Sequence, residues 1–365
     1  KKFLIEEYRM KLFTIGPVEM LPEIKKVGGE QIPYFRTDEF SNIMLESDRL
    51  IKKLMNSGEN SKSIYLTASG TAAMEAALMN CILPTDKLLV INGGTFGARF
   101  SQICDIHEYD YCEIKLGGNE ELTYKHLEEY ENIEFNALVV NIDETSTGQL
   151  YDIELLSQFC KRKGMYLIVD AISSFLCDRY DMSKYDIDIT IISSQKGLCI
   201  APGLSIVVLS DRIVTDRILV NNVKSLYFNF KEYIADFERG QTPFTPCVGI
   251  CLEMHKALAI VDSIGIDKYL NNIKTVALDF RNRIKDLPVS IPRFPLSNAI
   301  TPVIFEKPIA TKVFTTLKNE YQMMVNPTGG ENKEYSIRVA HIGNTTVNDN
   351  EKLVLAIKEI LKNIS

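Results

Sequence analysis

The sequence has no long apolar run, no excess of basic residues and no paired-cysteine motif. No stretch approaches the roughly 20 apolar residues of a membrane-spanning helix. Glu6 and Glu7 interrupt the N-terminal residues KKFLIEEYRM, so no signal peptide is predicted either. The formal net charge is −7, and no basic stripe carries interleaved aromatic residues, which argues against binding to nucleic acid.

Eight cysteines are scattered along the chain, and the closest pair, Cys247 and Cys251, lacks the CxxC spacing of a metal site. We therefore expect no metal and predict reduced thiols in a cytoplasmic protein. With 45% hydrophobic and 24% charged residues, the composition is that of an ordinary soluble globular protein. Its expected partners are small molecules or proteins.

Chain length and the order of apolar runs predict two domains. A chain of 365 residues exceeds the roughly 250–300 residues at which a single core stops growing. Between residues 63 and 210, runs such as KLLVIN, ALVVNI and YLIVDA alternate with helical patterns, which predicts a mostly parallel sheet with helices on both faces. We expect an N-terminal arm at 1–15, a large α/β domain at 16–260 and a smaller C-terminal α+β domain at 261–365.

Ligands of such sheets bind beyond the carboxyl ends of the strands. At one of these ends, YLTASGTAAMEAAL opens a helix through Ser69, Gly70 and Thr71. Free backbone N–H groups, two hydroxyls and the positive end of a helix dipole make this start suitable for a phosphate. The alternative is that Ser69 or Thr71 only caps the helix.

A carboxylate and an amine follow two further strands. Asp170 ends the apolar run YLIVD, where a carboxylate is costly unless a positive or protonated group meets it. A salt bridge, a turn cap or the pyridinium nitrogen of a pyridoxal cofactor would serve. Lys196 lies between two strands that are predicted to be buried, and burial lowers the pKa of a lysine and prepares it for Schiff-base formation.

Two loops at the same edge complete the pattern. Glu144 and Ser146 lie in the polar loop ETSTG. Phe96 lies among three glycines in INGGTFGARF, where its ring either stacks on a ligand or only fills a small gap at the surface. A phosphate cup, a carboxylate, an amine and an aromatic ring at one end of one sheet are what a fold type I pyridoxal-phosphate enzyme needs.

With these motifs in place, the sequence resembles the class V aminotransferases of fold type I, in the branch of alanine–glyoxylate, serine–pyruvate and 2-aminoethylphosphonate transaminases. SGTAAMEAAL, ETSTG, VDAISS and SSQKGL follow the family order and spacing, and the likeness runs from FTIGPVEM to IRVAHIG. It implies pyridoxal 5'-phosphate and a ping-pong reaction that moves an amino group from a small amino acid or aminophosphonate to a 2-oxo acid or aldehyde.

The resemblance also implies roles for single residues around the cofactor. Lys196 would form the Schiff base and then shuttle the proton of the substrate. Asp170 would hold the pyridine nitrogen protonated, Phe96 would stack on the ring, and Ser146 would reach the cofactor hydroxyl or the substrate. The residues expected at the phosphate are Ser69, Gly70, Thr71 and Gln195, together with Thr242 from the second subunit of a homodimer with shared active sites.

On the substrate side, the resemblance implies that Arg338 receives the carboxylate or phosphonate and that Gly16 forms a turn at the mouth of the site. Arg36 matches a position near the entrance, with no clear role. Arg239 stands where the family has a tyrosine that donates to the phosphate, so it would bind that phosphate or an anionic substrate. His341 is expected in the core or at the surface, with a substrate contact as the alternative.

Two other functions remain open. A pyridoxal-phosphate-dependent lyase such as a cysteine desulfurase would need a catalytic cysteine on a mobile loop, for which Cys247 and Cys251 are the candidates. A non-catalytic protein of the same fold would be expected to lack Lys196, Asp170 or Arg338, all of which are present.

Overall fold

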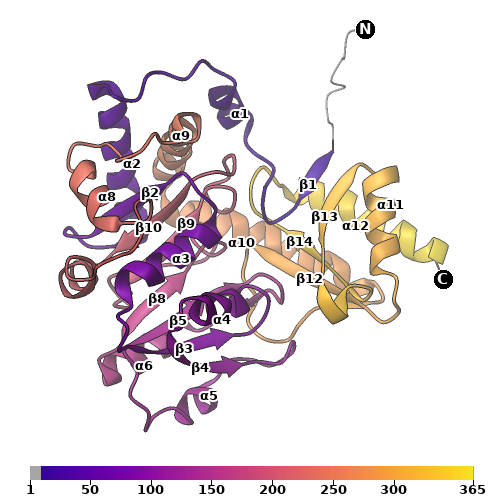
Figure 1. Cartoon of the computed structure of the whole chain (residues 1–365). Helices are drawn as coiled ribbons and strands as arrows, with labels where there is room; N and C mark the ends of the chain where they lie inside the picture. Colours follow the sequence, from indigo (N-terminus) through magenta and orange to yellow (C-terminus); the bar gives the residue numbers. More distant parts are fainter. Residues whose placement is uncertain (1–9, 365) are drawn as a thin grey trace.

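The computed structural model describes residues 10–364, and its larger part is a seven-stranded sheet (Figure 1). The strands, in spatial order, are β2 (Lys62–Leu66), β10 (Ser205–Leu209), β9 (Ile189–Ser193), β8 (Tyr166–Asp170), β5 (Ala137–Asn141), β3 (Lys87–Asn92) and β4 (Asp110–Lys115). Strand β10 is antiparallel to both of its neighbours, and the other pairs are parallel. The predicted α/β class with a mostly parallel central sheet is confirmed.

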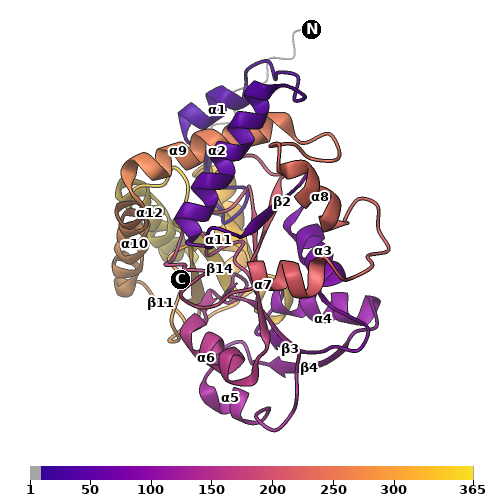
Figure 2. The ribbon, with the colours of Figure 1, turned by 90° about the vertical axis from the view of Figure 1, so that its left-hand side faces the viewer.

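Both faces of this sheet are buried, which explains why its strands are almost wholly apolar. In β3, Leu89 and Ile91 pack into one core, and Leu88 and Val90 pack into the other. The first core is covered by α1 (Pro22–Gly28), α2 (Asp38–Met55), α5 (Tyr124–Glu128), α6 (Ile153–Lys163) and α9 (Val248–Ile264). The second is covered by α3 (Gly70–Cys81), α4 (Gly97–Ile106), α7 (Asp211–Ile213) with the π-turn Val214–Ile218, and α8 (Phe230–Phe237). Figure 2 shows α2 and α9 on one side of β2, and α3 and α8 on the other.

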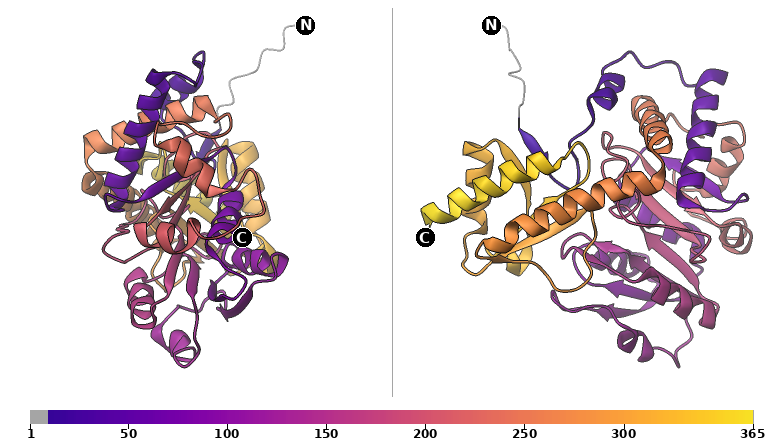
Figure 3. Two further views of the ribbon diagram at one scale, coloured as in Figure 1. Left: turned by 60° about the vertical axis from the view of Figure 1, so that its left-hand side comes forward. Right: turned by 180° about the vertical axis from the view of Figure 1, so that it is seen from behind.

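The smaller part of the molecule is a five-stranded sheet with its own core. Its strands, in spatial order, are β1 (Lys11–Phe13), β13 (Met323–Pro327), β14 (Ser336–Ala340), β12 (Ile300–Phe305) and β11 (Val289–Ser290). Helices α10 (Ile266–Arg283), α11 (Ala310–Glu320) and α12 (Val347–Ile364) pack on it, and 3₁₀ turns occupy Ile284–Asp286 and Gly330–Asn332. The right panel of Figure 3, seen from behind, shows α10 and α12 as the long orange and yellow helices in front of this sheet.

The arm expected at residues 1–15 contains a strand of the small sheet. Residues 11–13 form β1, which pairs in parallel with β13. A three-residue strand is too short to show a period in the sequence, and only its distant partner defines it. Residues 1–9 lie outside the described part of the chain, and the boundary expected at 260/261 falls inside α9. The division into two domains stays a prediction.

Hydrogen bonds join the two sheets beside the ETSTG loop, which forms the hairpin β6 (Asp143–Glu144) and β7 (Gln149–Leu150). Asp178, after β8, accepts hydrogen bonds from the Ser297 hydroxyl and from the backbone and side-chain amides of Asn298. The backbone N–H of Ser297 donates to the carbonyl of Gly148 at 3.1 Å. The segment that leads into β12 is thereby fixed against the loop that follows β5.

Within residues 10–364, no helix has both the length and the apolar character needed to cross a lipid bilayer.

Helix α4, which begins next to Phe96, is held on the sheet by Phe100. That side chain has no exposed surface, whereas Ile106 at the end of the same helix is 74% exposed. Phe100→Ala should lower the free energy of unfolding by about 3–5 kcal/mol because it leaves a cavity in the core. Ile106→Ala, the matched control, should change it by less than about 0.5 kcal/mol. Urea denaturation of both variants measures this, and equal losses would contradict the packing described.

Candidate active site

Five strands that run in one direction end at a predicted site residue or just before one: β2 (Ser69), β3 (Phe96), β5 (Ser146), β8 (Asp170) and β9 (Lys196). These ends lie at the same edge of the sheet, as expected for an open α/β fold. The Lys196 Nζ lies 5.8 Å from the centre of the Phe96 ring. The loops after β3 and β9 therefore meet, although the two residues are far apart in the sequence.

Lys196 lies in the turn of residues 194–198 that follows β9. Burial lowers its pKa to about 8; the nearby Arg338 guanidinium adds to this shift, and the carboxylates of Asp143 and Asp170 oppose it. Gly16 passes close to the side chain, since a Cβ at that position would lie 2.8 Å from both Cδ and Cε of Lys196. The expected amine with a lowered pKa is thus found, and Gly16 lies beside it.

Asp170 ends β8 and is 2% exposed. Its Oδ1 accepts the backbone N–H of Ile172 at 2.8 Å, and its Oδ2 accepts the side-chain amide of Asn141 at 2.9 Å. Burial raises the pKa of Asp170 to about 6, while these hydrogen bonds and the charge of Lys196 oppose the rise. Asn141 was not singled out from the sequence; it ends β5 opposite Asp170 in the parallel register, and a polar residue at the end of an apolar strand was the available signal.

Phe96 is held by a carboxylate that has no exposed surface. Glu144 accepts the backbone N–H groups of Phe96 at 3.1 Å and Gly97 at 2.8 Å, which are the first free donors of α4. Ser146 donates its hydroxyl to Glu144 and accepts the backbone N–H of Thr95 at 3.1 Å. The hydroxyl proton of Ser146 is therefore used within the loop, and only its oxygen can accept a further hydrogen bond.

At the start of α3, Ser69 caps the helix by accepting the N–H of Ala72 at 3.3 Å, and its role at a phosphate stays a prediction. Its side chain is exposed at the sheet edge. The Thr71 hydroxyl accepts a hydrogen bond from Arg99 at 2.8 Å. Gln195, predicted to lie near the same anion, accepts the Ser193 hydroxyl at 2.7 Å through its side-chain oxygen.

Thr242 and Arg36 belong to one hydrogen-bonded group. The Thr242 hydroxyl donates to the carbonyl of Phe244 at 2.7 Å. Arg36 donates to the carbonyl of Thr242 at 3.1 Å and to the side-chain oxygen of Gln241 at 3.2 Å. Arg36, whose role was open, thus fixes the segment that carries Thr242. Arg239 is exposed and forms an ion pair with Asp236.

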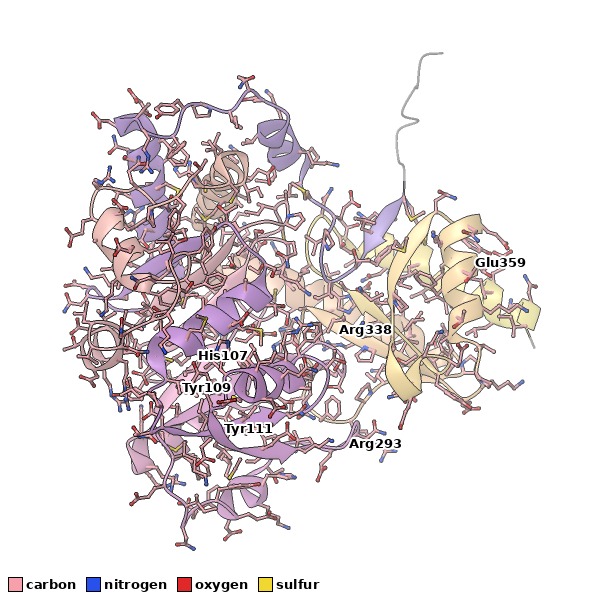
Figure 4. All side chains as sticks on the ribbon, viewed as in Figure 1. His107, Tyr109, Tyr111, Arg293, Arg338 and Glu359 are labelled. Atoms are coloured by element: carbon pink, nitrogen blue, oxygen red, sulfur yellow. The ribbon has the colours of Figure 1, made fainter. Side chains whose placement is uncertain are left out.

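Arg338 connects the small sheet to the site. It lies on β14, and Figure 4 shows it where the small sheet faces the larger part of the molecule. Its two terminal nitrogens donate to the carbonyls of Thr145 at 2.8 Å and Pro327 at 2.9 Å. The Nε atom is buried and has no hydrogen-bond partner among the described residues. Burial lowers the pKa of Arg338, and the carboxylates of Glu144 and Asp143 oppose this shift.

His341 is a core residue, so the core alternative is confirmed. It is 1% exposed, its Nε2 lies 2.7 Å from the Thr301 hydroxyl, and its ring packs against Phe280 at 5.2 Å. Burial lowers the pKa of His341 well below its ordinary value. This histidine is therefore neutral at physiological pH.

Asp143 is a further residue that was not singled out from the sequence. It has no exposed surface, and neither carboxylate oxygen has a hydrogen-bond partner within residues 10–364. Burial, with the nearby Asp178 carboxylate adding to it, raises the pKa of Asp143 well above its ordinary value. An acidic residue just after an apolar strand was the available signal, but the sequence does not show which way the side chain points.

The two cysteines that a lyase would need are part of a helix start. Cys247 is the residue before α9 and donates its backbone N–H to the Thr67 hydroxyl at 3.0 Å. Cys251 lies within α9 and has no exposed surface. Cys247 is thus fixed at the end of the irregular segment between α8 and α9, and Cys251 is fixed within a helix.

Comparison with known proteins gives a family match over most of the chain. The family described as aminotransferase class-V matches residues 34–330. An uncharacterized aminotransferase of Methanocaldococcus jannaschii is 28% identical over 361 residues, covering 96% of this chain and 91% of the relative. The 2-aminoethylphosphonate–pyruvate transaminase of Vibrio vulnificus is 26% identical over 345 residues, covering 89% and 90% of the two chains.

The fold is also that of a solved structure. The crystal structure of an alanine–glyoxylate aminotransferase from Nostoc sp. superposes with a TM-score of 0.90 at 23% identity, covering 96% of this chain and 95% of that one. This likeness confirms the predicted fold type I architecture. Since the family match spans residues 34–330, the chain belongs to the class-V aminotransferases, a family of pyridoxal-phosphate-dependent enzymes.

Proposed function

We propose that this aminotransferase carries pyridoxal 5'-phosphate covalently on Lys196 and works by a ping-pong mechanism. It would take the amino group of a small amino acid or aminophosphonate and then give it to a 2-oxo acid or aldehyde. The observation that carries the proposal is the position of Lys196, whose amine lies 5.8 Å from the Phe96 ring and has its pKa lowered to about 8 by burial.

The residues present around Lys196 fit this cofactor. Asp170 is buried, and each of its oxygens accepts one hydrogen bond, which leaves capacity for a protonated ring nitrogen. Asn141 fixes the orientation of that carboxylate. Phe96 offers an aromatic face, and the start of α3 with Ser69 and Thr71 offers donors for a phosphate. When bound, the cofactor supplies an electron sink for the electron pair released at the substrate α-carbon.

Lys196 would move the substrate proton. A general base works best when its pKa lies near the working pH, and a pKa of about 8 meets this condition better than the ordinary value of 10.5. Burial is the main cause of this lowered pKa; the Arg338 guanidinium adds to it, and the carboxylates of Asp143 and Asp170 oppose it. With its amine free, Lys196 would take the proton from the substrate α-carbon and pass it to the cofactor, and it would carry a proton in the opposite direction in the second half-reaction.

Arg338 would bind the acidic group of the substrate. Its guanidinium is anchored on the carbonyls of Thr145 and Pro327, and the N–H of the buried Nε has no acceptor among residues 10–364. A fixed guanidinium suits both carboxylates and phosphonates because its donors are planar and directional. The name of the Vibrio vulnificus relative supports an aminophosphonate donor as one candidate.

A homodimer with shared sites would complete the phosphate cup. Thr242 is the residue we expect from the second subunit, and its segment is already ordered by Arg36. Tyr34 and Ile32, which come just before Arg36 in the chain, are 68% and 50% exposed and would be available to a second subunit.

The eight cysteines are free thiols, which supports a cytoplasmic location.

Lys196→Ala tests the covalent assignment. The unmodified protein with added pyridoxal 5'-phosphate should show a visible absorption band that alanine or 2-aminoethylphosphonate removes and that pyruvate or glyoxylate restores. Lys196→Ala should still bind the cofactor but lose at least about 100-fold in turnover, because the general base is gone. Lys358→Ala, an exposed lysine on α12, is the control. Retained activity in Lys196→Ala would refute the assignment, and sulfide release from cysteine would favour a lyase.

Arg338→Gln tests the substrate contact. The substitution removes the charge and should raise the KM of the amino donor by about 10- to 100-fold. Arg293→Gln is the matched control, since Arg293 is an exposed arginine that lies apart from Arg338 (Figure 4). An unchanged KM for both alanine and 2-aminoethylphosphonate would contradict the role given to Arg338.

The reactivity of Lys196 in cofactor-free protein should depend on pH with a midpoint at about 8. Below this pH the amine is protonated and unreactive; above it the lone pair is free, whereas an ordinary lysine reaches this point near 10.5. Acylation rates of single lysines, measured by peptide mass spectrometry across the pH range, report this midpoint. The exposed Lys358 is followed in the same sample for comparison, and coincident profiles for the two lysines would contradict the prediction.

A further inference from the structure

Arg99 lies between two residues that are expected to bind the cofactor, although it was not predicted as a site residue. It belongs to the first turn of α4. Its guanidinium donates to the Thr71 hydroxyl at 2.8 Å, and its central carbon lies 5.2 Å from the centre of the Phe96 ring. One cation thus contacts both the start of α3 and the aromatic side chain at the start of α4.

The charge of Arg99 has no acidic partner in the described part of the chain. Among residues 10–364, no carboxylate lies within ion-pair distance of this guanidinium, and Thr71 takes one of its five N–H donors. By contrast, Arg239 is exposed and already paired with Asp236. A partly buried guanidinium with free donors therefore faces the start of α3 without a counter-charge.

The two helix starts near Arg99 differ in whether a carboxylate neutralises them. Glu144 already neutralises the start of α4 by accepting the N–H groups of Phe96 and Gly97. The start of α3 carries only the neutral cap Ser69. An anion that enters this corner would meet the positive end of α3 and the free donors of Arg99.

We propose that Arg99 is a direct ligand of the cofactor phosphate and binds it together with Thr71. The proposal rests on the proposed function, because it takes the start of α3 as the phosphate site. The ligand chemistry is a phosphate monoester dianion, which a guanidinium binds through two parallel N–H donors. A phosphonate group of a substrate has the same chemistry, so the experiment has to separate the two sources.

The experiment compares the binding of pyridoxal 5'-phosphate and of pyridoxal, which lacks the phosphate, to cofactor-free protein. Dissociation constants are measured by equilibrium dialysis and by the visible absorption band. Arg99→Ala should weaken pyridoxal 5'-phosphate binding by about 10- to 100-fold and leave pyridoxal binding unchanged. Arg99→Lys should give a smaller loss, and Arg293→Ala, the control at an exposed arginine outside the site, should change neither constant.

A second comparison separates a direct contact from an effect through Thr71. If Arg99 only positions the Thr71 hydroxyl, Arg99→Ala in a Thr71→Val background should cause no further loss, and this result would overturn the proposal. A further loss of about tenfold or more in that background supports a direct phosphate contact. Inorganic phosphate should also bind to the cofactor-free protein at this position. Its affinity, measured in the absence of pyridoxal 5'-phosphate, should fall in Arg99→Ala by the same factor.

Other results would overturn the proposal in distinguishable ways. Equal losses for pyridoxal and pyridoxal 5'-phosphate would assign Arg99 to packing around Phe96. A rise in KM confined to 2-aminoethylphosphonate, with cofactor affinity unchanged, would place Arg99 at the substrate. If the unmodified protein bound neither form of the cofactor at Lys196, the proposed function itself would fail. That failure would be independent of Arg99, because Arg99 is intact in the unmodified protein.

Discussion

The buried carboxylate of Glu144 organises the edge of the sheet where the site lies. A carboxylate without exposed surface costs several kcal/mol unless donors surround it, and Glu144 receives the N–H groups of Phe96 and Gly97 and both donors of Ser146. These bonds tie the loop after β5 to the start of α4. The next carbonyl, that of Thr145, accepts from Arg338 and so connects the small sheet to the same loop. This one short loop thereby fixes the positions of the Phe96 backbone, the start of α4 and Arg338.

Charge balance around Lys196 is the second constraint. Burial and Arg338 favour the neutral amine, whereas Asp143 and Asp170 favour the ammonium ion. These groups come from four separate segments: β14, the loop after β5, the end of β8 and the turn after β9. Because Arg338 lies on the small sheet and Asp143 and Asp170 lie beside the large one, the proton affinity of the amine depends on how the small sheet packs against the large one. The hydrogen bonds from Ser297 and Asn298 to Asp178 hold that arrangement.

Much of the site could be predicted from the sequence because its residues lie next to strand ends. Parallel strands end at the same edge of a sheet. The positions of Ser69, Phe96, Asp170 and Lys196 at one edge could therefore be predicted from the strand pattern. Contacts between side chains could not be predicted in this way. Arg99 and Thr71 begin different helices, and their hydrogen bond depends on how those helices pack. Arg36 likewise meets Thr242 through the packing of distant segments.

The sequence by itself determined the alternation of apolar runs and helices, the family motifs and therefore the fold class. Such patterns are local, because the period of a strand or a helix and the polar residue that ends it are written within a few positions. The tertiary structure decided that β1 joins the small sheet and that His341 lies in the core. It also decided that Asp143 is buried near Lys196 with no hydrogen-bond partner among the described residues. Each of these depends on burial and on side-chain direction, which distant parts of the chain impose.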